Sequence, residues 1–286
     1  MVTMTDNDGR RICDMTYEEK KEKLQKQMRV YAQGDVLVAF SGGVDSSLIL
    51  KLAAQAAVET GHKVYGIMMH TMLHPMGEVE DARATAEQIG AEFRVLEIDE
   101  LKGADILDNP VDRCYRCKKY LFRNLIEEGE KLGVSAMMEG TNEDDLHVYR
   151  PGLRAIRELG IHSPLAEAGM TKAEVRRLAG ELGISVSNKP SMPCLATRFP
   201  YGTRISYEAM RKVDEGEAFV RSLGFYNVRL RIHNDVARIE VDVNEMPRLL
   251  EHCEQIVAKL KNLGYDYITV DLEGFRSGSM DLHVKK

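Results

Sequence analysis

The most constraining feature of the sequence is an apolar run that leads directly into a glycine turn. Residues 35–40 read DVLVAF, a run typical of a strand buried on both faces of a parallel sheet. The next seven residues read SGGVDSS, and a helical pattern follows from Asp45 to about Thr60. A buried strand, a tight turn and a helix begin a β–α–β unit, so we expect a parallel α/β sheet.

Strands and helices continue to alternate over the first two thirds of the chain. They are expected at residues 63–69, 78–89, 93–98, 116–132 and 136–139. Thr16 and Thr171 each stand three residues before a glutamate, which is a capping box. The two boxes predict helices at 16–33 and 171–183. This order indicates an open parallel sheet with helices on both faces.

A proline-rich segment marks the expected domain boundary. Residues 188–202 read NKPSMPCLATRFPYG and show little periodicity, so a loop is expected there. Beyond it, a helix, two strands, a helix and a strand are expected at residues 208–223, 228–232, 237–241, 245–263 and 267–272. We therefore predict a first domain over residues 1–200 and a small α+β domain over residues 201–286.

Composition excludes several classes of protein. The 286 residues are 44% hydrophobic and carry a formal net charge of −6, which argues against a dedicated nucleic-acid binder. No apolar run approaches the roughly 18 residues of a membrane span. The first 21 residues contain no apolar stretch, so no secretory signal and a cytoplasmic location are expected. The five cysteines are then expected to be reduced.

The SGGVDSS string predicts an anion site. A helix start offers unpaired backbone N–H groups and the positive end of the helix dipole. Paired glycines let the backbone approach an anion closely, and serine hydroxyls add donors, so a phosphate or pyrophosphate would fit. The alternative is a tight turn in which a serine is only the N-cap of the helix.

Three of the cysteines suggest chemistry. Cys114 and Cys117 form a C-x-x-C pair among basic residues, and Cys194 stands alone in the proline-rich loop. The pair alone fits a redox site or half of a zinc site, whereas three thiolates suit an iron–sulfur cluster with one iron left open. We interpret Cys13 and Cys253 as bystanders.

Two further groups of polar residues are candidates for a binding site. Residues 140–145 read GTNEDD and follow the fourth expected strand, where Asp145 and its neighbours would hold Mg²⁺ or simply form a polar turn. Arg229 and Arg231 are two positions apart on an expected strand, so both point to one face. They fit either a phosphate clamp or a solvated strand face.

The glycine string resembles the PP-loop of the ATP pyrophosphatases and is not a Walker A motif. That family cleaves ATP between its α and β phosphates. The resemblance implies that ATP is bound by the loop and by the turn after the fourth strand, with Mg²⁺ near Asp45. The implied ATP ligands are Ser41, Gly42, Gly43, Asp45, Ser46, Ser47, Gly140 and Thr141. Adenine is expected near Met68.

Seven strings in order resemble the LarE-type sulfur transferases, from about residue 16 to 275. They are SGGVDSS, NPVDRCYRCK, GTNEDD, RPGLRAIRE, SPL, CLATRFPYG and RLRIHNDVARIEV. The resemblance implies adenylation of a carboxylate on a pyridinium mononucleotide and its conversion to a thiocarboxylate, in nickel-pincer cofactor biosynthesis. Arg229 and Arg231 would bind the substrate phosphate, Glu217 and Glu240 would face the site, and the family forms trimer-based hexamers.

The same resemblance implies two possible sulfur sources. In one form of the family a single cysteine, matching Cys194, gives up its own sulfur and is consumed. In the other, three cysteines hold a 4Fe–4S cluster whose open iron carries sulfide from a donor. Because this chain has Cys114, Cys117 and Cys194 together, the cluster form is expected.

Three rival functions belong to other classes. The first is a tRNA thiolase of the PP-loop superfamily, which would need an RNA-binding face that the composition does not suggest. The second is an amide-forming enzyme such as an NAD synthetase, which would not need the three cysteines. The third is a nucleotide sensor without catalysis.

Overall fold

The computed structural model describes residues 15–71, 78–148, 150–185, 194–276 and 278–280. The chain folds into two compact units. Among the described residues, the first unit is made of residues 15–71, 78–100, 114–148 and 150–185, and the second of residues 101–113, 194–276 and 278–280. No helix in the described part of the chain is long and apolar enough to cross a membrane.

The first unit contains a four-stranded parallel sheet in the order β3-β2-β1-β4. Its strands are β1 (Val36–Ala39), β2 (Val64–His70), β3 (Glu92–Glu97) and β4 (Ala136–Met138). Its helices are α1 (Tyr17–Tyr31), α2 (Val44–Thr60), α3 (Glu78–Ile89), α5 (Arg113–Leu132), α6 (Gly152–Glu158), α7 (Pro164–Glu167) and α8 (Lys172–Glu181). The predicted fold class is confirmed.

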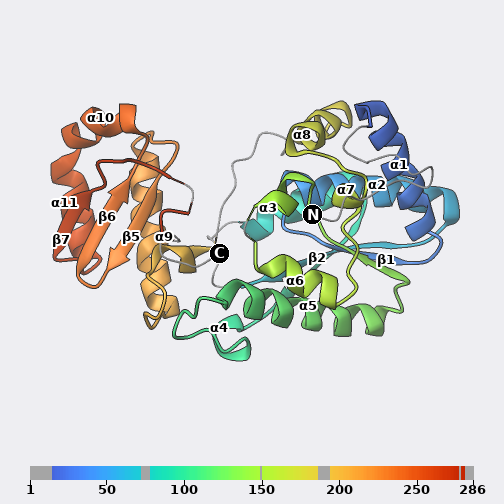
Figure 1. Cartoon of the computed structure of the whole chain (residues 1–286), viewed down its shortest axis with the longest axis horizontal. Helices are drawn as coiled ribbons and strands as arrows, with labels where there is room; N and C mark the ends of the chain where they lie inside the picture. The colour runs from blue at the N-terminus through green and yellow to red at the C-terminus, as the bar shows by residue number, and fades with distance from the viewer. Residues whose placement is uncertain (1–14, 72–77, 149, 186–193, 277, 281–286) are drawn as a thin grey trace. The chain divides into compact units, whose positions relative to one another are not determined.

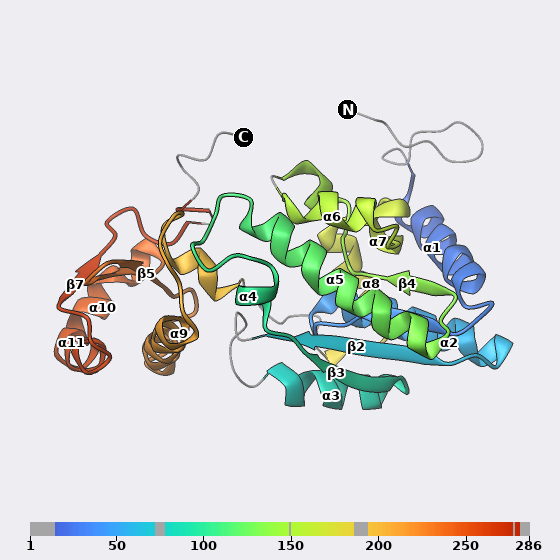
Figure 2. The ribbon, with the colours of Figure 1, turned by 90° about the horizontal axis from the view of Figure 1, so that it is seen from below.

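Strand β1 is buried on both faces, as its apolar run predicts. Val36 and Val38 pack with α1, α2 and α8 in one core, whereas Leu37 and Ala39 pack with α5 and α6 in another. Figure 1 shows α1, α2 and α8 on one side of the strands and α5 and α6 on the other. Seen from below, α5 lies over the strands (Figure 2). The sheet is therefore covered on both faces, and its carboxyl edge is left for the loops that follow β1 and β4.

The second unit contains a three-stranded sheet in the order β5-β6-β7. Its strands are β5 (Arg229–His233), β6 (Val236–Glu240) and β7 (Tyr267–Val270), with β5 antiparallel and β7 parallel to β6. Its helices are α9 (Tyr207–Ser222), α10 (Met246–Glu251) and α11 (Cys253–Asn262), and the short helix α4 (Glu100–Gly103) lies at the passage from the first unit. The unit has the small α+β fold that the sequence predicts.

One predicted helix is divided in two. The sequence predicts a single helix over residues 245–263, but His252 has φ of −97° and ψ of 11°, which ends α10 and caps α11. The His252 ring nitrogen lies 2.9 Å from the Gln255 amide, and the His252 carbonyl accepts from the Ile256 N–H at 3.1 Å. A local side-chain contact thus stabilises the break, which hydrophobic periodicity does not report.

The second unit includes a segment that the sequence places in the first domain. The Gly202 N–H donates to the Asn109 carbonyl at 3.0 Å, and the Ile205 N–H donates to the Leu107 carbonyl at 2.8 Å. The buried Asn109 amide donates to the carbonyls of Phe199 and Pro200. These contacts join residues 107–109 to residues 199–205, so the units are not divided by one boundary near residue 200.

Candidate functional site

The turn after β1 presents the start of α2 without a side-chain cap. Gly42 has φ of 70°, in the left-handed region, and a Cβ there would lie 3.2 Å from the Ala82 Cβ. Gly43 is the N-cap of α2 and supplies no side-chain acceptor. A serine N-cap is therefore not what this turn contains. The uncapped helix start, with its backbone donors and positive dipole end, suits an anion.

Ser46 holds the shape of this turn. Its hydroxyl oxygen lies 3.2 Å from the Ser41 backbone nitrogen, 3.1 Å from the Ser41 hydroxyl and 3.1 Å from the Gly43 carbonyl. Ser47 is buried, and its hydroxyl has no hydrogen-bond partner among the described residues. Ser46 thus organises the loop that the sequence predicts to bind ATP.

The loop after β4 packs directly against the turn after β1. A Cβ on Gly140 would lie 2.9 Å from the Ser46 backbone nitrogen, so only glycine allows this approach. The buried Glu139 carboxylate accepts from the Thr141 backbone N–H at 3.0 Å and from the Thr141 hydroxyl at 2.9 Å, which fixes the loop. The sequence places both loops at the same edge of the sheet, and the structure brings them into contact.

A charged group links these loops to α8. The Asn142 amide donates to the Asp45 carboxylate at 3.1 Å, and the Lys172 ammonium pairs with the same carboxylate. Burial raises the pKa of the Asp145 carboxyl, and the nearby Asp45 charge adds to this rise, whereas Arg150 opposes it at 2.9 Å. Two carboxylates and two cations therefore lie beside the expected phosphate site.

The site has two carboxylates, Asp45 and Asp145, which is the number that a nucleotide-bound magnesium ion can use. Mg²⁺ in such sites takes one or two carboxylates together with phosphate oxygens. The described residues contain no group of three His, Cys, Asp or Glu side chains that would hold a metal by themselves. Asp45 and Asp145 would be the protein ligands, and this assignment stays a prediction. Met68, expected near adenine, is buried in the core on β2, and that contact also stays a prediction.

The three cysteines belong to different units. Cys114 is exposed and Cys117 half-buried, both near the start of α5 in the first unit. Cys194 belongs to the second unit, where it begins a short 3₁₀ turn, η4 (Leu195–Arg198). No three His, Cys, Asp or Glu side chains of the described residues are grouped so that they could hold a metal ion. A cluster shared by the three cysteines therefore stays a prediction. Cys253 is exposed at the start of α11, and Cys13 lies outside the described residues.

The turn that begins at Cys194 is fixed by a buried ion pair. Arg198 donates to the Cys194 carbonyl at 3.2 Å and binds both oxygens of Glu217 at 2.8 Å. Burial opposes ionisation of Glu217, but the guanidinium and the Leu230 N–H hold the pKa of its carboxyl below the usual range. With 1% of its side chain exposed, Glu217 binds an arginine inside the unit.

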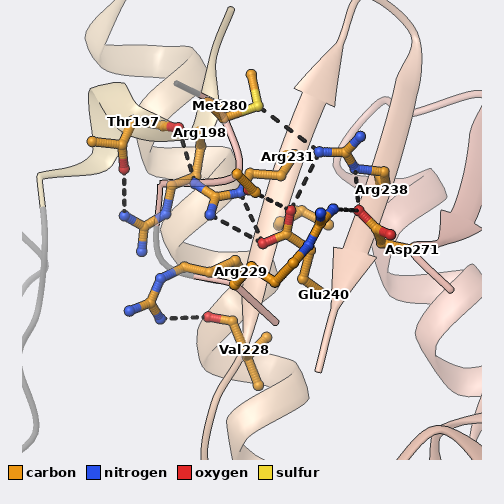
Figure 3. Close-up of polar contacts among 12 residues, drawn as sticks. Thr197, Arg198, Val228, Arg229, Arg231, Arg238, Glu240, Asp271 and Met280 are labelled. Carbon is orange, nitrogen blue, oxygen red and sulfur yellow. Dashed lines mark hydrogen bonds and ion pairs between the residues drawn. The ribbon is translucent and has the colours of Figure 1, made fainter. Parts of the chain in front are cut away.

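A second buried pair fixes the same turn from the sheet. Arg231 binds Glu240 at 3.0 Å and donates to the Thr197 carbonyl at 3.0 Å (Figure 3). Glu240 is fully buried and also accepts from Arg238 at 3.3 Å and from the Ser279 hydroxyl at 2.8 Å. Glu217 and Glu240 are thus engaged by the unit's own residues, and their predicted contact with substrate stays a prediction.

Arg229 differs from the other arginines of this face. Its guanidinium donates to the Val228 carbonyl at 2.7 Å, apart from the Glu240 carboxylate (Figure 3). It forms no ion pair with any carboxylate among the described residues. Burial and the nearby charge of Arg198 lower the pKa of Arg229 to about 10, so the side chain is still a cation at neutral pH. The strand places Arg229 and Arg231 on one face, but among the described residues only Arg231 of the two forms an ion pair, and Glu217 acts on Arg229 only as a nearby charge.

Sequence reasoning missed Lys172 and Arg198. Lys172 directly follows the capping residue Thr171, which predicts a helix start but not the distant Asp45 partner. Arg198 lies in the proline-rich loop four residues after Cys194, where no periodic pattern marks it. Their partners lie 127 and 19 residues away along the chain, so only the fold identifies them.

Comparisons with known proteins show which family the chain belongs to. A family model described as NAD synthase matches residues 16–109, which include the turn after β1. A pyridinium-3,5-bisthiocarboxylic acid mononucleotide synthase from Lactiplantibacillus plantarum is 38% identical over 246 residues, which cover 86% of this chain and 88% of that protein. The chain belongs to the LarE-type family of PP-loop ATP pyrophosphatases.

Other relatives match different shares of this chain. An uncharacterized protein from Synechocystis sp. is 35% identical over 264 residues, which cover 91% of this chain and 97% of that protein. A tRNA-specific 2-thiouridylase from Rickettsia felis is 29% identical over 197 residues, which cover 55% of this chain and 52% of that protein. The LarE-like match therefore extends over both units, whereas the thiouridylase match covers about half of the chain.

Proposed function

We propose that this LarE-type enzyme uses ATP to activate a carboxylate of a pyridinium mononucleotide and then replaces the activated oxygen with sulfur. The 38% identity to a pyridinium-3,5-bisthiocarboxylic acid mononucleotide synthase supports the substrate class. The product would serve nickel-pincer cofactor biosynthesis.

The reaction has two balanced steps. A substrate carboxylate oxygen attacks the α-phosphorus of ATP, forming an acyl adenylate and releasing pyrophosphate. A sulfur nucleophile then adds to the acyl carbon, and AMP leaves with the oxygen that joined it to the substrate. A carboxylate oxygen is a poor leaving group, so adenylation makes the second step possible.

The observation that carries this proposal is the anion site at the start of α2. The site has an uncapped helix start, a left-handed Gly42 and the close approach of Gly140 to the Ser46 nitrogen. A pyrophosphate leaving group gains negative charge as the α–β bond breaks, and preformed backbone donors stabilise such charge without reorganisation. The PP-loop residues would therefore bind the departing pyrophosphate.

Arg229 would bind the phosphate of the mononucleotide. It is a half-buried cation that forms no ion pair with a carboxylate in the described part of the chain, whereas Arg231 is already paired with Glu240. The sequence predicts the same role for both arginines. Their different surroundings favour Arg229 as the direct phosphate ligand and Arg231 as a residue that fixes the neighbouring turn.

The sulfur comes from one of two sources in this proposal. A 4Fe–4S cluster on Cys114, Cys117 and Cys194 would supply an open iron that carries sulfide. In the alternative, the Cys194 thiolate attacks the acyl carbon, a base removes its Cα proton, and cleavage of the Cβ–S bond leaves dehydroalanine and the thiocarboxylate.

Product analysis tests the proposed function. The full chain is incubated with ATP and either the pyridinium dicarboxylate mononucleotide or unmodified tRNA, and AMP, ADP and pyrophosphate are quantified. AMP and pyrophosphate that depend on the mononucleotide are expected, together with a product heavier by the replacement of oxygen with sulfur. Formation of ADP would contradict the PP-loop chemistry, and dependence on tRNA would favour the thiolase to which the 29% identity points.

The assembly is a separate part of the proposal. By its family, the enzyme would form trimer-based hexamers, and sedimentation velocity of the purified full chain measures this directly. A single species at the mass of one chain, 32.2 kDa, would contradict it.

A further inference from the structure

Arg229 differs from the arginines around it because it packs against an aromatic ring and not against a carboxylate. Arg198, Arg231 and Arg238 each bind a glutamate or aspartate. Arg229 instead lies over the ring of Phe275, with its guanidinium carbon 5.1 Å from the ring centroid. The ring is half-buried and follows β7 in the chain.

A tight turn at Gly274 positions Phe275 beside Arg229. Gly274 has φ of 70°, and a Cβ there would lie 2.9 Å from the Val241 carbonyl oxygen and 2.7 Å from the Val243 side chain. The Gly274 N–H donates to the Asp271 carbonyl at 3.0 Å, and the Phe275 N–H donates to the Val241 carbonyl at 2.8 Å. Val241 follows Glu240, the residue directly opposite Arg229 in the sheet register. The backbone thus holds the ring beside the arginine.

An aromatic ring supports an arginine in a different way from a carboxylate. The negative face of the ring attracts the cation but accepts no hydrogen bond in the guanidinium plane. A carboxylate would cancel the charge and occupy two of the N–H donors. With Phe275 beneath it and one donor on the Val228 carbonyl, Arg229 keeps its charge and its other donors for a ligand.

We propose that Phe275 is a positioning residue that holds Arg229 ordered and charged so that its free donors bind the substrate phosphate. This inference rests on the proposed role of Arg229 in phosphate binding. It assigns a function to the segment after β7, which makes further contacts on the same face: the Ser279 hydroxyl bonds Glu240, and the Met280 sulfur lies 3.9 Å from Arg238 (Figure 3).

A double-mutant cycle on the full chain tests the inference. The dissociation constants of a pyridinium mononucleotide and of ATP are measured by calorimetry for Phe275→Leu, Phe275→Tyr, Arg229→Gln and the double variant Phe275→Leu/Arg229→Gln. Leucine keeps an apolar side chain and removes the ring face, whereas tyrosine retains the face. Tyr267→Leu, an exposed ring on β7, is the matched control. Circular dichroism checks that each variant is folded.

Phe275→Leu is expected to weaken mononucleotide binding about threefold to tenfold, the scale of a lost cation–π contact, with ATP binding unchanged. Phe275→Tyr and Tyr267→Leu are expected to bind as the natural chain does. In the Arg229→Gln background, Phe275→Leu should have no further effect, because the ring acts through that arginine.

Two results would overturn the inference and leave the proposed function standing. One is full affinity in Phe275→Leu while Arg229→Gln binds weakly. The other is an equal loss from Phe275→Leu in both backgrounds, which would mean that the ring contacts the substrate itself. If Arg229→Gln binds the mononucleotide normally, the phosphate assignment fails and the role of Phe275 fails with it.

Discussion

At the scale of single residues, the hydroxyl of Ser46 holds the turn that forms the proposed anion site. It contacts both the backbone nitrogen and the hydroxyl of Ser41, as well as the carbonyl of Gly43. Ser46→Ala should lower the rate of AMP formation by about 10²-fold, the scale of losing an oriented group that stabilises developing charge. Pyrophosphate release measures the loss, and Ser222→Ala, an exposed serine at the end of α9, serves as the control. Normal turnover in Ser46→Ala would show that the loop is a structural turn without a role in the reaction.

Glu217 shows that a residue expected near substrate also stabilises the unit. Glu217→Gln removes the buried carboxylate charge that Arg198 binds through both oxygens, so the free energy of unfolding should fall by about 3 kcal/mol. Because the pKa of the native carboxyl lies below its unfolded value, this contribution is complete above the unfolded pKa, about 4.3, and is lost as pH falls through the native pKa.

Urea unfolding at several pH values measures both effects of Glu217→Gln. The difference in stability between the natural chain and the variant should narrow as the pH is lowered below about 4. Glu208→Gln, on the exposed side of the same helix α9, should leave the unfolding midpoint unchanged. A difference that stays constant with pH would show that the ion pair is not its source.

At the scale of elements, helix α8 contributes both to the stability of the first unit and to the geometry of the proposed ATP site. Its capping box at Thr171 is matched by the box at Thr16 on α1. Thr171→Ala and Thr16→Ala should each lower the free energy of unfolding by about 1 kcal/mol. Only Thr171→Ala should also raise the KM for ATP, because Lys172 pairs with Asp45 and its N–H donates to Asp144 at 2.8 Å. Equal ATP kinetics in both variants would contradict this link.

At the scale of the whole molecule, the proposed cluster would take its cysteines from both units. If a cluster supplies sulfur, anaerobically purified protein should be brown, and Ala variants of Cys114, Cys117 and Cys194 should each lose the colour and the activity. Cys253→Ala should keep both. If Cys194 is consumed instead, mass spectrometry after turnover should show that residue about 34 Da lighter, from loss of H₂S. Dehydroalanine at Cys194 with Cys114 and Cys117 dispensable would contradict the cluster and leave the sulfur transfer intact.

The sequence alone predicted the features that depend on near neighbours in the chain. The apolar run over residues 35–40 gave a strand buried on both faces, and the two capping boxes gave α1 and α8. The glycine string gave an uncapped helix start at the edge of a parallel sheet. Periodicity, caps and turn residues act within about one helical turn, so a sequence pattern records them directly.

Only the tertiary structure decided which charges meet. The strand pattern predicts the same orientation for Arg229 and Arg231. In the folded chain, however, Arg231 pairs with Glu240, whereas Arg229 packs against the ring of Phe275. Likewise, Asp45 lies in a recognisable loop, but its partner Lys172 is 127 residues away. The physical reason is that a buried charge takes its partner from whatever segment packs against it, and that choice is made by the arrangement of the elements rather than by their local sequence.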